Sequence, residues 1–571
     1  MNSSSKKIAF FLSLTAMLFS CASPLEPETE SSSSMTTMEE TSMIETSESL
    51  SSSSEEETKN LVNPARLVRN EFGQMRMEVD GKFFLPLGAQ LRLDGLMNRD
   101  GTEGSDAPRA LTVAELAPYF EAAKNLGLNE LEISIDWADL EPEEDQYDFS
   151  IPLGILELAN LYDMKVCFLW FGTNMCGWTN SFQVPSYIVN DPVTYPVYES
   201  APRYSKMYGK QFFIVLDTPA LLEREAKVMK AMLDEVYEWN LIDKKNPLIA
   251  IQIHNEADCL LRWRVDQSQP KMNGEVLSKE RAWESNLASI RAVCDAVKQA
   301  KYKPLTRVNV CVSLGVGDFP QAEGLHYSPK DYLDIDTLDM IGDDPYSENP
   351  VAVANSVRAY MSLENNFGHV AENMGDYPQA AMLSLVAVAQ GGGYLHYDLA
   401  TPPFFNYMNQ GSTYRMDQGL LMDDLIDKAH SPSVRALSKA LQGLGEVALK
   451  ANQEDFAVFN CKRLTPTMSY EERVRTTGCD IHFQTDMGAF GFAVEYEDYL
   501  YLYASEDATY SFEGGEFSMV AEPGKYVDGE FVSVGEKVYK TVGYNLKGKT
   551  LYRLKIRQKN PGVSTVNEYL Q

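Results

Sequence analysis

Short apolar runs alternate with amphipathic segments from about Leu61 to Leu449. Between the runs, apolar residues recur at helical spacing, as in Val113 to Leu126, Pro219 to Trp239 and Arg281 to Ala300. Strands that are apolar on both faces, each followed by a helix, favour an α/β fold: a closed parallel (β/α)8 TIM barrel over residues 59–450. The alternative is an open doubly wound sheet. Eight runs rich in β-branched and aromatic residues are the expected strands: Phe83 to Leu87, Glu130 to Ile135, Lys165 to Phe171, Leu248 to His254, Arg307 to Val312, Thr337 to Ile341, His369 to Ala371 and Gly393 to Tyr397.

After a last helix near Ser433 to Lys450 the pattern changes. Helical spacing becomes rare, and short alternating runs are separated by Gly, Asp and Asn. This pattern predicts a smaller all-β sandwich domain over residues 451–571. Its expected strands are Ala457 to Phe459, Asp480 to Gln484, Gly491 to Glu497, Tyr499 to Tyr503, Glu516 to Val520, Lys537 to Gly543 and Thr550 to Ile556.

The first 21 residues have the pattern of an export signal. Lys6 and Lys7 precede an apolar stretch that is too short to span a bilayer comfortably, and it ends Leu18-Phe19-Ser20-Cys21. This ending resembles a bacterial lipobox, which implies lipidation at Cys21 and a lipid-anchored protein of the bacterial cell envelope or cell surface. An ordinary signal peptide of a secreted protein, or a buried N-terminal helix, remains the alternative. Residues 22–58 are rich in Ser and Glu and are expected to form a disordered tether.

The net charge narrows the range of partners. The chain of 571 residues carries a formal charge of −32, which repels phosphate backbones and argues against nucleic acid. A neutral substrate such as a carbohydrate is unaffected by this field. Beyond the anchor, no membrane segment is expected.

The cysteine and histidine spacing indicates neither a metal nor another cofactor. Without Cys21, seven cysteines remain, with no Cys-x-x-Cys pair, and the six histidines stand singly. Cys167 and Cys311 lie in apolar runs and are expected to be small core residues, while a pairing of Cys461 with Cys479 is left open.

The candidate chemistry lies where apolar strands end in polar residues. The fourth expected strand ends in Asn255-Glu256, and the seventh leads into Glu372. Barrel active sites lie at the C-terminal ends of the strands, so the two carboxylates are expected to share one cavity. A single strand-end Glu is more often an ion-pair or capping residue, but two facing carboxylates are what glycosidic cleavage requires: one protonates the leaving oxygen and the other attacks the anomeric carbon or activates water.

Several motifs in the same order resemble family 35 glycoside hydrolases, the retaining β-galactosidases of the large clan A of barrel enzymes. They are Met77 to Gly88, the stretch Trp137-Ala-Asp-Leu-Glu-Pro-Glu-Glu-Asp-Gln-Tyr-Asp-Phe149, Phe168 to Gly172, Ile251 to Glu256 and Gln390 to Tyr394. In addition, Gly524 to Gly529 resembles the small C-terminal β domain found in one branch of these enzymes.

This resemblance implies a role for each matching residue. Glu256 would be the general acid and then base, and Glu372 the nucleophile of a retaining double displacement. Asn255 would bind the sugar 2-hydroxyl, or merely hold the strand end. Tyr346 would orient Glu372, or be an ordinary turn residue. Tyr394, in the eighth strand, is expected to line the pocket.

Three tryptophans are candidate stacking platforms for a sugar ring, because aromatic faces fit the apolar side of a pyranose. They are Trp137, Trp170 and Trp178; plain core packing is the alternative, and it is favoured for Trp137 and Trp170. The sequence also departs from the family. His254 replaces an acidic residue and is expected either to contact substrate or to be a bonded strand-end histidine, and Ala89-Gln90 replaces a pair that binds galactose hydroxyls.

The resulting hypothesis is a glycoside hydrolase, a retaining exo-β-glycosidase. The expected activity is that of a β-galactosidase releasing terminal galactose from oligosaccharides or plant-type polysaccharide side chains. Two alternatives remain: an endo-β-glycanase of the same clan, and a surface glycan-binding lipoprotein without catalysis.

Overall fold

The structure is a computed structural model, and its described residues belong to one unit, Ser54–Gln571. They are residues 62–91, 112–205, 209–243, 246–311, 329–375, 377, 379–397, 399, 431–461 and 470–559. The predicted signal, the lipidation site at Cys21 and the tether over residues 22–58 lie outside them. None of the described helices has the length and apolar character needed to cross a membrane.

Eight parallel strands form a closed barrel, in the order β10-β13-β14-β15-β16-β4-β5-β6. The barrel closes where β16 pairs with β4, with Tyr394 opposite Leu87. The predicted TIM barrel is therefore confirmed, and the open sheet is wrong. The strands are β4 (Leu87–Leu91), β5 (Glu130–Ile135), β6 (Lys165–Met175), β10 (Leu248–Asn255), β13 (Leu305–Val310), β14 (Met340–Asp343), β15 (His369–Met374) and β16 (Gly393–Tyr397).

The first barrel strand lies further along the chain than predicted. Lys82–Phe84 is β3 of a separate antiparallel sheet with β1 (Ala65–Arg69) and β2 (Met75–Val79). Phe83 and Phe84 are only half-buried there, whereas all five residues of β4 are buried. The aromatic pair therefore belongs to a hairpin, and β4 carries Gln90 into the barrel.

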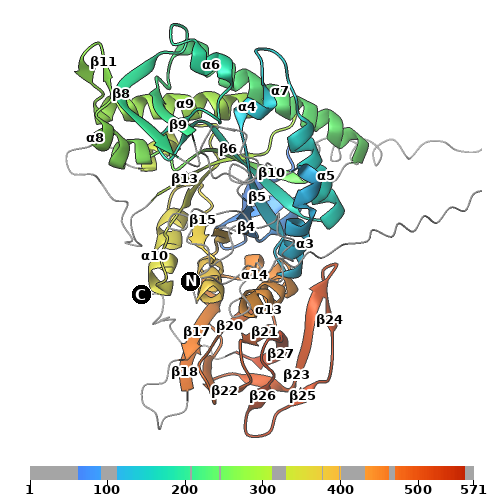
Figure 1. The fold of residues 1–571 in the computed structure, drawn as a ribbon. Coiled ribbons are helices and arrows are strands. Elements are labelled where there is room, and N and C mark those ends of the chain that lie inside the picture. Colours follow the sequence, from blue (N-terminus) through green and yellow to red (C-terminus); the bar gives the residue numbers. More distant parts are fainter. Residues whose placement is uncertain are drawn as a thin grey trace, which may run out of the picture. The chain divides into compact units, whose positions relative to one another are not determined.

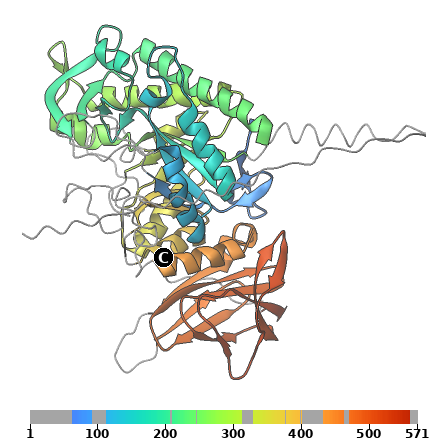
Figure 2. The same cartoon turned by 45° about the vertical axis from the view of Figure 1, so that its right-hand side comes forward.

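Helices surround the barrel in blue to yellow (Figure 1). The long helices α7 (Pro219–Asp243) and α9 (Lys279–Gln299) pack against each other and run side by side (Figure 2). The start of α9 is set by Ser278, whose side chain accepts a hydrogen bond from the Arg281 backbone N–H. The other main helices are α3 (Ala117–Asn125), α5 (Ser150–Tyr162), α10 (Pro350–Met361), α11 (Ala380–Ala389) and α13 (Ser431–Gly443).

Two segments, one between β6 and α7 and the other between β10 and α9, form a small additional sheet in the order β12-β11-β8-β9-β7. Short helices also follow the barrel strands, including α4 (Trp137–Leu140) after β5 and α6 (Ser186–Asn190) before β8. The sheet's strands are β7 (Thr179–Asn180), β8 (Val197–Ser205), β9 (Gly209–Ile214), β11 (Lys271–Met272) and β12 (Glu275–Val276).

The C-terminal part consists of two antiparallel sheets, as predicted for a sandwich. One has the order β17-β20-β21-β27-β23-β24, with β25 pairing to β23, and the other the order β18-β19-β22-β26. Phe459, Phe483 and Tyr510 from the two sheets stack in a common core. The strands are β17 (Phe456–Cys461), β18 (Tyr470–Arg475), β19 (Asp480–Thr485), β20 (Ala489–Tyr496), β21 (Tyr499–Ala504), β22 (Ala508–Glu513), β23 (Glu516–Val527), β24 (Glu530–Ser533), β25 (Val538–Tyr539), β26 (Tyr544–Leu546) and β27 (Tyr552–Gln558).

Both faces of β21 are covered. Leu500 and Leu502 belong to the core between the two sheets, while Tyr501 and Tyr503 join an apolar cluster with Leu437 of α13. These tyrosines are each 1% exposed, so they have a structural role in the described part of this domain. Cys461 and Cys479 are both free, so the pairing left open does not occur.

Candidate active site

Two carboxylates stand at the C-terminal ends of barrel strands. Glu256 directly follows β10, and Glu372 lies in the second half of β15. His254 and Glu256 both have positive φ, 61° and 43°, a conformation that costs free energy in residues with a side chain. Asn309 on the neighbouring strand β13 accepts a hydrogen bond from the Glu256 backbone N–H at 2.8 Å, which holds this turn.

The Glu372 carboxylate is held by one donor on each oxygen. Gln90 on β4 donates to Oε1 at 2.8 Å, and the Tyr346 hydroxyl donates to Oε2. Gln90 also donates to Glu132 on β5 at 2.7 Å. Glu372 is 1% exposed, so these donors replace the water that an ionised carboxylate needs.

The charge of Glu372 affects the ionisation of Glu256. Burial raises the pKa of Glu256 to about 7, and the negative charge of Glu372 adds to this increase. A hydrogen bond from the Cys176 thiol to Glu256 Oε2, at 3.0 Å, opposes it. The pKa of Asp344 is likewise raised by burial and then by the charges of Glu372 and Glu256. Glu256 therefore holds a proton near neutral pH.

A polar network joins three adjacent strands behind Glu256. The Asn309 side chain donates to Asn255 Oδ1 at 3.0 Å and to Asp344 Oδ2 at 2.7 Å. Asn255 is 1% exposed and donates to the Cys176 sulfur at 3.4 Å. The amide of Asn255 is therefore fixed at the barrel end, beside Glu256.

A buried arginine balances part of this negative charge. Arg307 on β13 forms an ion pair with Glu132 and donates to Gln252 Oε1 at 3.0 Å. Burial lowers the pKa of Arg307 to about 10, which leaves it charged at neutral pH. The interior of the barrel therefore has one fixed cation beneath its carboxylates.

Among the residues around Glu256 that were not predicted from the sequence are Asn309, Asp344 and Cys176. Asn309 interrupts an apolar strand, and Asp344 is the last acidic residue before the Pro-Tyr turn, so both carried a detectable polar signal. Cys176 directly follows β6, and nothing in the sequence around it indicated a role in the site.

Two of the candidate stacking residues are core residues in the structure. Trp137 and Trp170 are both fully buried in the main apolar cluster, with ring centroids 6.4 Å apart. Trp137 Nε1 donates to Glu141 at 2.9 Å, and Trp170 Nε1 donates to Glu225 of α7 at 2.8 Å. Neither presents a face to a sugar, so the core alternative holds for both.

His254 also points away from the barrel interior. Its Nε2 lies 3.1 Å from Glu225 Oε1 on α7, and the ring is fully buried. The pairing of β10 with β6 shifts register between Ile253 and Asn255, and this bulge directs the side chain outward. Of the two roles expected for His254, the structure therefore shows the contacts of the bonded strand-end histidine.

Trp178 and Tyr394 line two different cavities, and neither Glu256 nor Glu372 lines either of them. Trp178 packs on Phe213 at 4.5 Å, with Arg203 and Arg264 over its ring, and it lines a cavity formed by the loops after β6. Tyr394 lines a cavity at the N-terminal end of the barrel with Pro86, Glu130 and His369, so the structure does not place it in the candidate site.

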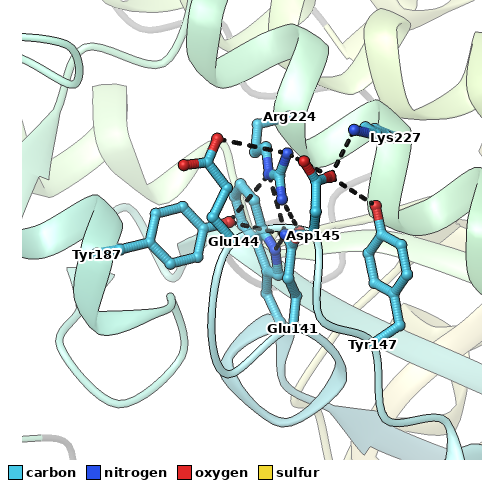
Figure 3. Close-up of polar contacts among 8 residues, drawn as sticks. Glu141, Glu144, Asp145, Tyr147, Tyr187, Arg224 and Lys227 are labelled. Atoms are coloured by element: carbon cyan, nitrogen blue, oxygen red, sulfur yellow. Dashed lines mark hydrogen bonds and ion pairs between the residues drawn. The ribbon is translucent and has the colours of Figure 1, made fainter.

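Acidic side chains of the motif Trp137 to Phe149 attach the loop after β5 to helix α7 (Figure 3). Arg224 of α7 is 7% exposed and forms an ion pair with the buried Glu141. It also donates to Asp145 at 2.9 Å and to the Tyr187 hydroxyl at 3.1 Å. The motif therefore fixes the loop after β5 against α7.

Comparisons with known proteins give a family model and a set of solved structures. Residues 286–466 match a domain of unknown function, DUF4978, a segment that contains Tyr346 and Glu372 but begins after Glu256. No curated protein matches the chain in sequence.

Three of the solved structures that this chain is similar to bear the names of glycosidases. An exo-β-1,4-mannosidase from Opitutaceae bacterium strain TAV5 is 14% identical with a TM-score of 0.42, over 68% of this chain and 63% of that one. A β-galactosidase from Halorubrum lacusprofundi is 14% identical with a TM-score of 0.41, over 63% and 58%. A family 1 β-glucosidase from Thermotoga maritima is 10% identical with a TM-score of 0.41, over 63% and 98%. This chain therefore spans less than two thirds of the length of the first two.

Proposed function

We propose that the chain is a glycoside hydrolase that cleaves β-glycosides with retention, with Glu256 as acid and base and Glu372 as nucleophile. The proposal rests on one observation: the two carboxylates at one end of the barrel have different environments, and the charge of Glu372 acts on the pKa of Glu256. Burial and the charge of Glu372 raise the pKa of Glu256 to about 7, while Glu372 receives two hydrogen bonds. One group holds a proton to give, and the other is oriented to attack.

In the first step, a Glu372 oxygen attacks the anomeric carbon while Glu256 gives its proton to the leaving oxygen. The glycosidic bond breaks, and an ester joins the sugar to Glu372. The ester is neutral, so the charge that helped to raise the pKa of Glu256 is gone, and Glu256 becomes a carboxylate. It then takes a proton from water, whose oxygen attacks the same carbon and releases Glu372.

Two neighbours support these steps. The Tyr346 hydroxyl donates to Glu372 Oε2 and fixes the direction of the other oxygen. Asn255, fixed by Asn309, is in position to donate to the sugar 2-hydroxyl, a contact that strengthens in the transition state.

The proposed substrate is a terminal β-galactosyl unit of an oligosaccharide or of a plant-type polysaccharide side chain. The resemblance of the segments around Trp137 and Glu256 to family 35 supports this choice. Gln90 differs from the residue that family 35 has at this position. Its side-chain amide donates hydrogen bonds to both Glu372 and Glu132, so it helps to hold the proposed nucleophile in place.

The same proposal places the enzyme outside the cytoplasm, lipid-anchored through Cys21. The Lys6-Lys7 start, the apolar stretch and the Ser/Glu-rich tether support it. Expression in a bacterial host with a radiolabelled fatty acid should label the wild type and not Cys21→Ser. Equal labelling of both would exclude this anchor.

The activity is tested with a panel of nitrophenyl β-glycosides of galactose, glucose and mannose. Glu372→Gly should lower kcat more than about a hundredfold, while Glu364→Gln, an exposed carboxylate after α10, should change it less than about twofold. Glu256→Ala should retain more activity on dinitrophenyl than on alkyl glycosides, because a good leaving group needs no proton, and azide should rescue it with a β-glycosyl azide as product. Turnover of no glycoside by the wild type, or full activity of Glu372→Gly, would overturn the assignment.

A further inference from the structure

Glu256, the proposed acid and base, lies close to two thiols, and all three side chains have atoms that can bind a metal ion. Glu256 and Cys259 are three residues apart in a turn, and the Cys259 backbone N–H donates to the Glu256 carbonyl at 2.9 Å. Groups with this spacing on one turn lie on the same side of the backbone. The turn therefore brings the Cys259 thiol next to the Glu256 carboxylate.

The third group comes from the neighbouring barrel strand. Cys311 follows β13, which pairs with β10 in the barrel. Its backbone N–H donates to Asp258 Oδ1 at 3.2 Å, which ties the end of β13 to the turn after β10. As a result, the ligand atoms of Glu256, Cys259 and Cys311 all lie within 4.8 Å of one another.

These two cysteines differ from the other buried cysteines in their surroundings. Cys294 of α9 lies in the main apolar cluster, and Cys167, Cys461 and Cys479 lie in other clusters. Among the described residues, those apolar clusters include neither Cys259 nor Cys311, although these side chains are 0% and 8% exposed. Core packing alone therefore does not account for two thiols at this place.

We propose that Glu256, Cys259 and Cys311 form a binding site for a thiophilic divalent cation, Zn²⁺. Two thiolates and a carboxylate are a common zinc ligand set, with bonds of about 2.3 Å to sulfur and about 2.1 Å to oxygen. The ligand atoms of the three residues, all within 4.8 Å of one another, are close enough to bind one ion together.

The surroundings favour a cation. Asp258 stands between Glu256 and Cys259 in the chain, and its carboxylate accepts a hydrogen bond from the Cys311 backbone N–H, so an acidic side chain lies beside the ligand groups. On binding, the two thiols and, where it is protonated, the Glu256 carboxyl release their protons to solvent, and the ion gains two Zn–S bonds and one Zn–O bond.

The consequence for catalysis rests on the proposed function. A zinc-bound Glu256 carboxylate can neither carry nor accept the proton, so Zn²⁺ is a reversible inhibitor, and a chelator restores activity. The site is thus a binding site for an inhibitory ion and not for a catalytic one.

Binding is tested first without reference to activity, on the fully reduced whole protein. Titration with Cd²⁺ should give a cadmium–thiolate charge-transfer band that saturates at one equivalent, and calorimetry should show one Zn²⁺ site. Cys259→Ser/Cys311→Ser should lose the band and weaken Zn²⁺ binding at least about tenfold, whereas Cys294→Ser should keep both. Glu256→Gln, which retains the thiols and the side-chain shape, should also weaken binding.

Equal binding by the wild type and the double variant would overturn the site, as would an equal loss in Cys294→Ser. If the double variant does not fold by circular dichroism, Glu256→Gln decides, and unchanged Zn²⁺ affinity there rejects the site. Inhibition is then measured on the nitrophenyl glycoside, with each protein's metal-free rate as its own reference. Binding without any glycosidase activity would reject the proposed function and leave the metal site standing.

Discussion

Replacing Glu256 with Gln should make the protein more stable at alkaline pH while it removes the proposed acid. Burial and the charge of Glu372 raise the pKa of Glu256 from its ordinary value of 4.5 to about 7. Below pH 4.5 the folded and unfolded states both hold the proton, so the shift has no effect on stability. Between pH 4.5 and 7 the unfolded state releases it and the folded state does not, and above 7 the folded state carries the full cost of a buried charge.

The size of this cost follows from the shift. A difference of about 2.5 between the two pKa values corresponds to about 3.4 kcal/mol at 1.36 kcal/mol each. Glu256 is partly exposed, and solvent screening reduces the figure to about 2 kcal/mol. A Gln side chain keeps the shape and carries no charge, so it avoids the cost at every pH.

The assay is thermal unfolding of wild type and Glu256→Gln at pH 4.5 and pH 8. Because the barrel has roughly 390 residues, about 2 kcal/mol should raise Tm by about 2 °C at pH 8 relative to the difference at pH 4.5. Comparing the two pH values cancels any effect of the substitution that does not depend on ionisation. Glu275→Gln, an exposed residue of β12, is the matched control and should show no such dependence.

A Tm difference between wild type and Glu256→Gln that is the same at both pH values would refute the reasoning. It would mean that Glu256 is not held in a buried, negatively charged setting. The proton needed near neutral pH would then have no physical basis in this residue.

Three further predictions concern the same set of contacts. The kcat/KM of the wild type on a nitrophenyl glycoside should fall as pH rises through about 7, because Glu256 must be protonated. The Cys176 thiol lowers the pKa of Glu256, so Cys176→Ala should move this decrease in kcat/KM to a pH about half a unit higher. Tyr346→Phe should lower kcat by about 10- to 100-fold and leave KM within about threefold, because a hydrogen bond to a charged carboxylate is lost; a pure KM effect in steady-state kinetics would contradict this. Arg307→Met should destabilise the protein by about 3–5 kcal/mol in urea unfolding, because Glu132 loses its buried partner, and Arg307→Met/Glu132→Gln should recover part of the loss; no recovery would contradict the ion pair.

The barrel, the C-terminal β region and the two strand-end carboxylates could be predicted from the hydrophobic pattern of the chain. Few folds can bury strands that are apolar on both faces and are separated by amphipathic helices, so the period of the hydrophobic pattern was sufficient to predict the barrel. Glu256 and Glu372 were predictable because each ends an apolar run, and the parallel strands of a barrel bring these ends together at its C-terminal face. The first strand was misplaced because Phe83 and Phe84 form a hairpin strand of similar composition.

Which polar and aromatic residues face the site depends on contacts between distant segments of the chain. The alternation of side chains breaks at the bulge between Ile253 and Asn255, so His254 turns outward to Glu225 although it immediately precedes Asn255 and Glu256. Asn309, Cys176 and Cys311 reach Glu256 from other segments of the chain, and no spacing along the sequence encodes that meeting. Local pattern specifies each element and its buried face, whereas a site assembled from several elements depends on strand register and on the turn taken at each strand's end.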